Sequence, residues 1–473
     1  MVVTQRPGRA IADGLGRLTC VSRSEAPLSS LPVLDLSETQ PSVPVLASTC
    51  RLVTLGCKVN QYETQLVKEG LERYGWREAA AEEPAALCVV NTCTVTAEAD
   101  SKARQVIRQL AKANPGCATI VFGCYATRAA DELSHLPGVV EVVADPRELP
   151  DVLQRFGVHD WPGGISRFDG HRRAFVKVQD GCLLNCTYCI IPAVRPGLRS
   201  REPADILSEI QRLVSNGYRE IVLTGIHLGH FGVEATRGRS GRAPYRLWHL
   251  LREIDRLPGD FRVRLSSLEA AEVGDEFLQV VGDCQRLVPH FHLCLQSGSD
   301  RILESMKRRY RSGRFLEQVR KIRDRLHNPA LSTDVIVGFP GETEEDFEQT
   351  LRVCETAEFL KIHAFPFSRR RGTPAHDFPD QVSPEIRQRR MHDLRELEAR
   401  LQARYHSRLP GERLQVLVEA RPAQLAGHVT GTACRYVPVE FPGGRSLLGQ
   451  LCDVTVTEVR DGLVLAKQTE SHP

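Results

Sequence analysis

The stretch Phe175-Val-Lys-Val-Gln-Asp-Gly-Cys182 runs from strand-like sequence straight into a cysteine, and Cys186 and Cys189 follow at the spacing C-x3-C-x2-C. No fourth cysteine and no histidine lies between Asp180 and Arg199. A structural zinc site needs four ligands, so this window supplies one too few. Three thiolates can instead hold a cubane iron–sulfur cluster whose fourth iron stays open to a small molecule. The spacing of these loop cysteines therefore predicts such a cluster, and three buried cysteines without a metal are the alternative.

A second group of three cysteines shares one sequence context although the chain separates its members widely. Cys57, Cys93 and Cys124, the strand-end cysteines, each end a short apolar run that suits a strand buried on both faces of a parallel sheet. Helical patterns over 61–75 and 98–113 separate these runs. Strand–helix repetition predicts a parallel α/β sheet, whose ligands gather at the carboxyl ends of the strands. Each cysteine alone is most simply a small buried hydrophobe, but the shared position predicts a second metal cluster.

The remaining nine cysteines lack this context, and two of them, Cys117 and Cys434, lie in predicted loops and are left unassigned. Most of them lie within or beside apolar runs, where a buried thiol is the usual state. The total of fifteen is odd and the chain has no secretory hydrophobic segment, so we expect a reducing cytosol and no disulfide framework. The nine are Cys20, Cys50, Cys88, Cys117, Cys284, Cys294, Cys354, Cys434 and Cys452.

Composition allows several hydrophobic cores and excludes a membrane span. The chain has 473 residues, of which 41% are hydrophobic, and no run approaches the ~18 consecutive apolar residues that a span requires. The formal net charge of +3 is close to neutral, so no overall field indicates a nucleic-acid partner. Basic clusters occur at 307–311, 369–371 and 387–390. Charge runs are usually solvated faces, so composition alone does not decide whether the protein binds RNA.

The chain is predicted to be α/β with three domains. Residues 1–48 are rich in Ser, Pro and Arg and predict a disordered extension, with an upstream start codon or a transit peptide as alternatives. A parallel α/β domain is expected over 49–155 and a partial barrel of six strand–helix units over 168–400. An amphipathic helix over 384–409 leads to a small β-barrel over 408–470, a type that often binds nucleic acid. The strands of this small barrel are expected at 414–419, 428–432, 437–441, 453–459 and 463–467.

The partial barrel is expected to bind a polar cofactor at one rim. Its strands are predicted at 175–178, 221–224, 262–265, 292–295, 333–337 and 362–365, and active sites of βα barrels lie at the carboxyl ends of the strands. Several of these strand ends are polar or glycine-rich. At any one position this is typical of an ordinary turn, but several such ends on one rim favour a binding site. The residues predicted to bind the cofactor are Tyr188, Thr224, Gly225, Ser267, Gln296, Ser297, Asp334 and Gly338.

From residue 51 to 469 the chain resembles the radical S-adenosylmethionine (SAM) methylthiotransferases. Three signatures carry the resemblance: Thr54-Leu-Gly-Cys-Lys-Val-Asn-Gln-Tyr-Glu63, Asn91-Thr-Cys-Thr-Val-Thr-Ala-Glu-Ala-Asp100, and Val178-Gln-Asp-Gly-Cys182 with Tyr188-Cys189-Ile-Ile-Pro192. The segment Thr224-Gly-Ile-His-Leu-Gly-His-Phe-Gly232 is similar to that of the branch acting on threonylcarbamoyladenosine in tRNA. The C-terminal part is similar to a TRAM domain, which is an RNA-binding barrel.

The resemblance implies two 4Fe–4S clusters and S-adenosylmethionine as cofactors. The loop cysteines would hold a cluster whose open iron binds the methionine part of SAM, and the strand-end cysteines would hold an auxiliary cluster that delivers sulfur. Reduction would yield a 5′-deoxyadenosyl radical that removes hydrogen from C2 of the adenine, a carbon without an acidic proton. A second SAM would supply the methyl group. The resemblance implies no catalytic residue beyond the cluster ligands.

The implied enzyme adds a methylthio group to N6-threonylcarbamoyladenosine at position 37 of tRNA, in the cytoplasm. The anticodon loop would present the base at a low unstacking cost, and a flavodoxin or ferredoxin would donate electrons. An alternative is methylthiolation of isopentenyladenosine in tRNA or of a ribosomal protein residue. A second alternative, from another class, is an RNA-binding protein whose clusters act only as redox sensors.

Two positions depart from the family pattern. Asn185 stands where an aromatic residue usually precedes the second loop cysteine, and Ala193-Val-Arg-Pro-Gly197 replaces the usual Tyr and Arg-Gly pair. Neither departure removes a cysteine. We therefore expect them to affect the shape of the loop over the cluster rather than the class of reaction.

Overall fold

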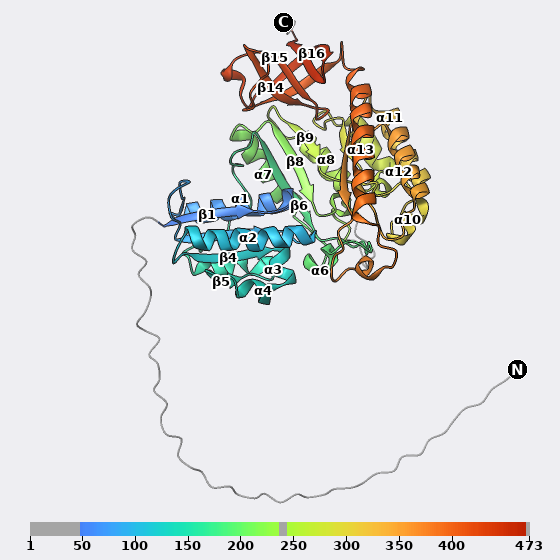
Figure 1. The fold of residues 1–473 in the computed structure, drawn as a ribbon. Coiled ribbons are helices and arrows are strands. Elements are labelled where there is room, and N and C mark those ends of the chain that lie inside the picture. Colours follow the sequence, from blue (N-terminus) through green and yellow to red (C-terminus); the bar gives the residue numbers. More distant parts are fainter. Residues whose placement is uncertain (1–47, 236–243, 470–473) are drawn as a thin grey trace, which may run out of the picture. The chain divides into compact units, whose positions relative to one another are not determined.

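The computed structural model describes residues 48–235 and 244–469 (Figure 1). The extension expected over 1–48 lies outside the described residues, apart from residue 48 itself. The described chain forms, in order, a parallel sheet, a partial barrel and a small closed barrel. Its largest hydrophobic core consists of side chains from the strands of the partial barrel and from the helices that cover them. Among the helices of the described residues, none combines the length and apolar character that a membrane crossing requires.

The first sheet is fully parallel, which confirms the prediction. Its order is β2-β1-β3-β4-β5. The central strand β3 (Leu87–Thr92) is buried at every position, so its first four residues are continuously apolar instead of alternating. The Thr96 side chain caps helix α2 (Ala97–Ala113) by accepting a hydrogen bond from the Ala99 N–H. The other elements are β1 (Thr49–Thr54), α1 (Lys58–Arg73), β2 (Arg77–Glu78), β4 (Ala118–Gly123), α3 (Cys124–Arg128), α4 (Ala130–Ser134), β5 (Val139–Val142) and α5 (Leu149–Gln154).

Parallel strands form the partial barrel, and this also confirms the prediction. They make two ladders, β6-β8-β9 and β10-β11-β12, which isolated bridges such as that between Val263 and Leu287 join. The short strand β7 (Arg199–Ser200) adds an antiparallel edge to β6. The parallel strands are β6 (Arg173–Asp180), β8 (Glu220–Gly225), β9 (Arg262–Leu265), β10 (His290–His292), β11 (Ala330–Val337) and β12 (Lys361–Pro366). Helices packed on them include α7 (Pro203–Ser215), α8 (Leu247–Asp255), α9 (Asp275–Asp283), α11 (Ser312–Arg325) and α12 (Glu344–Ala357).

The fourth barrel strand differs from the prediction. The structure has β10 at His290–His292, whereas the sequence predicted a strand over 292–295. The regular ladder stops because the Leu295 N–H donates to the Thr333 hydroxyl at 3.0 Å instead of to a carbonyl, and Gln296 then takes a φ of +64°. The apolar residues of this segment remain buried, which is why their sequence resembles that of a strand.

A long helix and a closed barrel complete the fold. Helix α13 (Pro384–His406) begins after Ser383, whose hydroxyl accepts a hydrogen bond from the Ile386 N–H. The barrel has the order β13-β14-β15-β17-β16, and pairing of β13 with β16 closes it, so it has no free edge. This confirms the predicted small barrel. Its strands are β13 (Arg413–Glu419), β14 (His428–Ala433), β15 (Pro438–Pro442), β16 (Leu451–Arg460) and β17 (Leu463–Gln468).

Buried ion pairs join the C-terminal barrel to the amino-terminal ends of the central strands. Glu220, the first residue of β8, is fully buried and pairs with Arg173, Arg262 and Arg264. Arg262 and Arg264 also donate to main-chain carbonyls of the C-terminal region at 2.5–3.2 Å. One carboxylate therefore compensates several buried cations that hold the C-terminal barrel in place. The carbonyl acceptors belong to Gln415, Thr432, Ala433 and Cys434.

We predict that Glu220→Gln lowers the free energy of unfolding by about 3–5 kcal/mol, because removing one partner leaves buried charges uncompensated. Urea unfolding of the purified variant and the wild type measures this change. Glu348→Gln removes an exposed i,i+4 partner of Arg352 and should leave the free energy of unfolding nearly unchanged. Similar unfolding midpoints for the two variants would contradict the prediction.

Candidate metal centres

The strand-end cysteines lie at the carboxyl edge of the first sheet. They follow β1, β3 and β4, which are adjacent strands. Two glycines allow the strand ends to meet. A Cβ at Gly56 would lie 2.8 Å from the Cβ of Cys93, and a Cβ at Gly123 would lie 2.4 Å from Oδ1 of Asn91. Both glycines also have positive φ angles, +114° and +95°, so other residues would be strained there.

A single buried amide ties these ends together. Nδ2 of Asn60, in the first turn of α1, donates to the carbonyls of Leu55 and Thr92 at 2.9 and 3.1 Å and to Oδ1 of Asn91 at 3.0 Å. Oδ1 of Asn60 lies 3.6 Å from Sγ of Cys57. Asn60 is 1% exposed, so these bonds are shielded from water. The loop before Cys57 and the end of β3 before Cys93 are therefore fixed to each other.

The strand-end thiols form a site that disfavours free thiolates. Burial is the main cause that raises the pKa of Cys93 to about 11, and the Cys124 and Cys57 sulfurs add to the rise. Cys93 and Cys124 are buried, whereas Cys57 is exposed. The three sulfurs are thus near enough to affect one another, and only Cys57 is exposed. A bound metal would supply the positive charge that three neighbouring thiolates need.

The loop cysteines lie after β6, at the carboxyl rim of the partial barrel. Gly181 begins the loop with a φ of +75°, and a Cβ there would lie 1.7 Å from a backbone carbonyl across the loop. Two side chains from elsewhere in the barrel contact the sulfurs. Nη1 of Arg308 donates to Sγ of Cys186 at 3.3 Å, and Nδ1 of His227 lies 3.2 Å from Sγ of Cys182.

Acidic residues hold both of these nitrogen donors in position. Arg308 pairs with Glu269, and Nε2 of His227 pairs with Glu272. Although burial lowers it, the hydrogen bonds to Cys182 and Glu272 raise the pKa of His227 to about 10. The imidazole is therefore cationic at neutral pH. Burial raises the pKa of Cys186, and the Arg308 guanidinium opposes this rise.

Several residues predicted to bind a cofactor lie on this rim. Tyr188 accepts a hydrogen bond from Arg308 at 3.4 Å. Thr224 and Gly225 end β8, and Ser267 is exposed just after β9. Asp334 on β11 is half-buried, and its carboxylate lies within 4.8 Å of ligand atoms of His292 and Cys294. Their contact with a cofactor stays a prediction.

Three of the predicted cofactor residues serve the packing of the loops. The hydroxyl of Ser297 is buried against the Thr350 hydroxyl at 3.4 Å. Gln296 pairs through its backbone with β11, its N–H donating to the Asp334 carbonyl at 2.8 Å. Gly338 has a φ of +73°, and its N–H donates to Glu342 at 2.7 Å. A role of these residues toward a cofactor also stays a prediction.

The basic clusters of the sequence are not simply solvated faces, because each contributes a buried arginine to the interior. Arg308 contacts Cys186 as described above. Arg370 pairs with Asp100 of α2 at 2.6 Å, and Arg390 pairs with Glu342 at 2.7 Å. Sequence reasoning missed these roles, together with those of Asn60 and His227. Asn60 and His227 lie inside the quoted signatures, so membership of a signature was the sequence feature that could have pointed to them.

Comparisons with known proteins identify the family. The Radical SAM superfamily model matches residues 176–354, and the model described as Uncharacterized protein family UPF0004 matches 49–145. The chain is 36% identical over 429 residues to threonylcarbamoyladenosine tRNA methylthiotransferase MtaB of Bacillus subtilis (strain 168), covering 86% of this chain and 94% of that protein. The chain belongs to the radical SAM methylthiotransferases. Each of the two matched regions contains one of the two groups of cysteines.

Other members of the family have similar coverage. The MtaB of Chlamydia pneumoniae is 37% identical over 423 residues, covering 89% of this chain and 96% of that protein. The tRNA-2-methylthio-N(6)-dimethylallyladenosine synthase of Carboxydothermus hydrogenoformans is 33% identical over 429 residues, covering 86% of this chain and 96% of that protein. Both named branches of the family therefore align along nearly the same length of chain.

The donor atoms present fit the iron–sulfur chemistry of this family. Thiolates are the soft ligands that suit iron–sulfur clusters, and each site offers three of them. Each site also has an arginine N–H directed at a sulfur: Arg308 at Cys186, and Arg195, whose Nε lies 3.2 Å from Sγ of Cys124. Such hydrogen bonds are typical of the surroundings of cluster sulfurs.

We predict that Gly123→Ala destabilises the fold by roughly 1–3 kcal/mol, because the added Cβ would overlap Asn91 and the Thr92 backbone. Gly163→Ala is the control, since a Cβ there would meet nothing within 4 Å. Urea unfolding monitored by circular dichroism compares the variants. Equal stability of the two would show that the strand ends are not packed as closely as described.

Proposed function

We propose that this protein adds a methylthio group to C2 of N6-threonylcarbamoyladenosine at position 37 of tRNA, beside the anticodon. The observation that supports the proposal is that both groups of three cysteines follow the carboxyl ends of parallel strands, and that one sulfur in each group accepts a hydrogen bond from an arginine. Relatives at 36 and 37% identity are named for this substrate. The relative named for dimethylallyladenosine makes that nucleoside the main competing substrate.

The two cysteine groups would have different roles. The loop cysteines would hold the 4Fe–4S cluster that binds SAM, and the strand-end cysteines would hold a second 4Fe–4S cluster. When bound, these groups supply one-electron cleavage of SAM and the sulfur for an unactivated carbon. The side chains of Arg308 and His227 would orient Cys186 and Cys182, and the Arg308 cation would favour the charged form of Cys186. Thr224, Ser267 and the other predicted rim residues would bind the polar parts of SAM.

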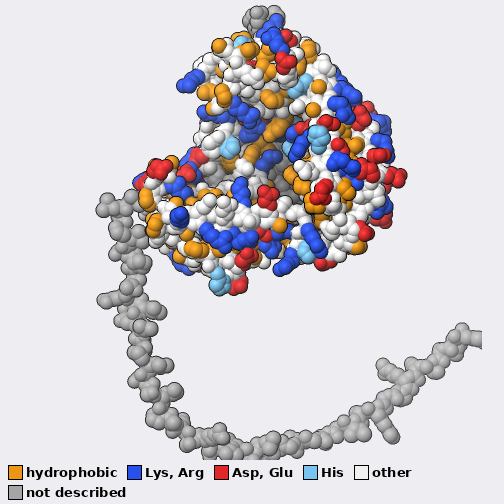
Figure 2. Space-filling model, viewed as in Figure 1, with side chains coloured by type: hydrophobic (Ala, Val, Ile, Leu, Met, Phe, Trp, Pro, Cys, Tyr) orange, Lys and Arg blue, Asp and Glu red, His pale blue; other side chains and the backbone are white. Residues whose placement is uncertain are grey.

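Each of the three domains would have its own role. Residues 49–155 would form the auxiliary-cluster domain, 168–400 the SAM-binding barrel and 408–470 a TRAM-like RNA-binding barrel. Lys and Arg side chains gather along α2 in Figure 2, where Lys102, Arg108 and Lys112 are exposed and could contact phosphates. A flavodoxin or ferredoxin in the cytoplasm would supply the electrons.

Changing each group of cysteines to Ala should separate the two roles. We expect the loop-cysteine variant to lose 5′-deoxyadenosine formation, because SAM has no iron to bind. The strand-end variant should still cleave SAM but should insert no sulfur. Anaerobic assays with a reductant, SAM and unmodified tRNA, analysed by mass spectrometry, measure both products.

Iron analysis is the control for this pair of variants. Each variant should keep about half of the roughly eight irons per chain that two such clusters contain. Identical product profiles from the two variants would contradict the division of roles. Reconstituted wild type that holds both clusters but never cleaves SAM would favour a redox-sensing RNA-binding protein instead.

Deletion of the gene should remove the 2-methylthio form of threonylcarbamoyladenosine from cellular tRNA and leave its unthiolated form. Mass spectrometry of tRNA nucleosides measures the two forms, and a complemented strain is the control. If the strain instead loses the 2-methylthio form of the isopentenyl nucleoside, the proposed substrate is wrong although the reaction class stands.

A further inference from the structure

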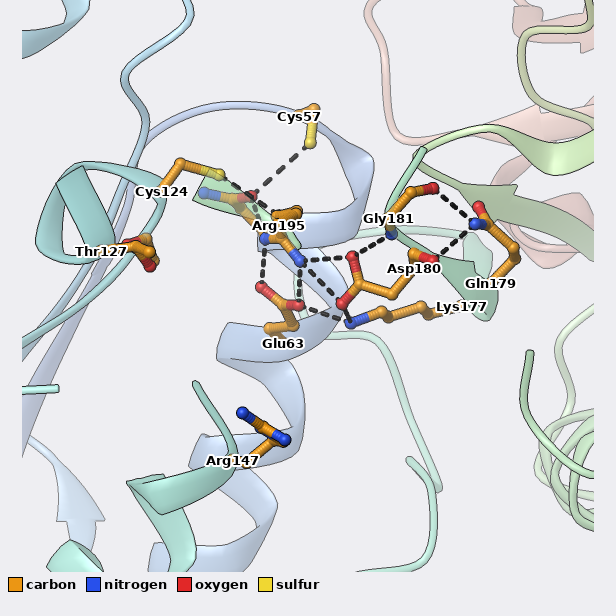
Figure 3. A network of polar contacts seen from close by, with 12 residues as sticks. Cys57, Glu63, Cys124, Thr127, Arg147, Lys177, Gln179, Asp180, Gly181 and Arg195 are labelled. Atoms are coloured by element: carbon orange, nitrogen blue, oxygen red, sulfur yellow. Dashed lines mark hydrogen bonds and ion pairs between the residues drawn. The ribbon is translucent and has the colours of Figure 1, made fainter. Parts of the chain in front are cut away.

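One buried arginine connects the two candidate cluster sites. Arg195 follows helix α6 (Ile191–Val194), which itself follows the last loop cysteine. Its Nε lies 3.2 Å from Sγ of Cys124, the strand-end cysteine on α3. Nη1 and Nη2 form a bidentate ion pair with Glu63, donating to its two carboxylate oxygens at 2.8 and 2.9 Å (Figure 3). All three guanidinium nitrogens are therefore engaged, and the side chain is only 3% exposed.

Arg195 belongs to a group of four charges that balance one another. Nζ of Lys177 lies 2.7 Å from Glu63 and 2.6 Å from Asp180, and Nη1 of Arg195 lies 3.0 Å from Asp180. Two cations and two anions thus share one partly buried space beside Cys124. Although burial raises it, Arg195 and Lys177 hold the pKa of Glu63 down at about 2. The carboxylate is therefore charged at neutral pH, and the group as a whole is neutral.

These charges come from both domains that carry cysteines. Glu63 lies on α1, which follows Cys57, whereas Lys177 and Asp180 lie on β6, which leads into Cys182. The apolar side chains around Arg195 make the same connection, because Ile190 and Val194 pack against Cys124. Nη2 of Arg195 also donates to Oδ1 of Asn60 at 3.1 Å. The segment after the loop cysteines thus contacts the strand-end site directly.

We propose that Arg195 is a positioning residue that orients Sγ of Cys124 and raises the reduction potential of the auxiliary cluster, and that Glu63 opposes this effect. The proposal rests on the proposed function, since it needs a cluster on the strand-end cysteines. An N–H donor and a nearby positive charge both stabilise the more negative, reduced state of a cluster. In a low-dielectric site, neutralising one member of a balanced group leaves a net charge that acts on its neighbours.

The two neutral substitutions should therefore have opposite signs. Arg195→Gln leaves one unbalanced negative charge and removes the strong donor to sulfur, so the potential should fall. Glu63→Gln leaves one unbalanced positive charge, so the potential should rise. Arg195→Lys keeps the positive charge, but an ammonium group lacks the planar guanidinium that contacts Glu63 and Cys124 together. The potential of this variant should therefore lie between those of the wild type and Arg195→Gln.

The test uses full-length protein in which the loop cysteines are changed to Ala, so that only the auxiliary cluster remains. Redox titration followed by electron paramagnetic resonance of the reduced cluster gives its midpoint. We expect Arg195→Gln to lower the equilibrium constant for reduction of the cluster at least tenfold, which lowers the midpoint potential by about 59 mV for one electron. Glu63→Gln should raise the midpoint potential. Arg155→Gln is the control, because Arg155 pairs with Glu141 at an exposed site in the same domain and should leave the midpoint unchanged.

The outcomes distinguish failure of this inference about Arg195 and Glu63 from failure of the proposed function. Opposite shifts for the substitutions at 195 and 63 support the inference, whereas unchanged midpoints or shifts of the same sign overturn it. If Arg195→Gln fails to assemble a cluster, Arg195→Lys and Glu63→Gln give the same comparison of signs. In protein whose strand-end cysteines are changed to Ala, Arg195→Gln should shift the remaining cluster less, and an equal shift would overturn the inference. Absence of any cluster in the otherwise unchanged background would overturn the proposed function instead.

Discussion

A buried charge needs a partner, and this constraint joins the parts of the described chain. Glu220 holds arginines that donate to the C-terminal barrel. Asp100 on α2 pairs with Arg370, which lies beyond β12 at the other end of the partial barrel. Glu63 on α1 pairs with Arg195 after the cysteine loop. Because breaking any such pair leaves an uncompensated charge, each pair restricts how the elements it joins can be placed.

The placement that results brings the two candidate cluster sites into contact through one short segment. Parallel strands in each sheet present their carboxyl ends on one edge, and the cysteines follow those ends. The segment from Cys189 to Arg195 starts in one site and reaches a sulfur of the other. Under the proposed function, this segment would connect the SAM-binding site to the site of the second cluster, and close contact between them would help to keep water out during the reaction.

The parts of the fold that depend on local sequence were predictable. The apolar run of β3, the amphipathic patterns of α1 and α2, and the short strands of the C-terminal barrel all matched their elements, because each buries a face that its own sequence shows. The strand predicted over 292–295 did not match, since the Thr333 hydroxyl interrupts the ladder there by accepting from the Leu295 N–H and donating to the Leu293 carbonyl. The two-residue strands β2 and β7 were also not predicted, because so few residues carry no periodic signal.

The sequence by itself determined the spacing of the loop cysteines, the repeated strand-then-cysteine context and the alternation of strands and helices, since these are properties of neighbouring residues. Only the tertiary structure decided which arginines of the basic clusters are buried, that Asn60 joins the loop before Cys57 to the end of β3, and that Arg195 contacts Cys124. A side chain's partner and burial depend on residues far away in the chain. A charged residue looks the same in sequence whether it faces water or a buried carboxylate, and only the packed fold separates the two.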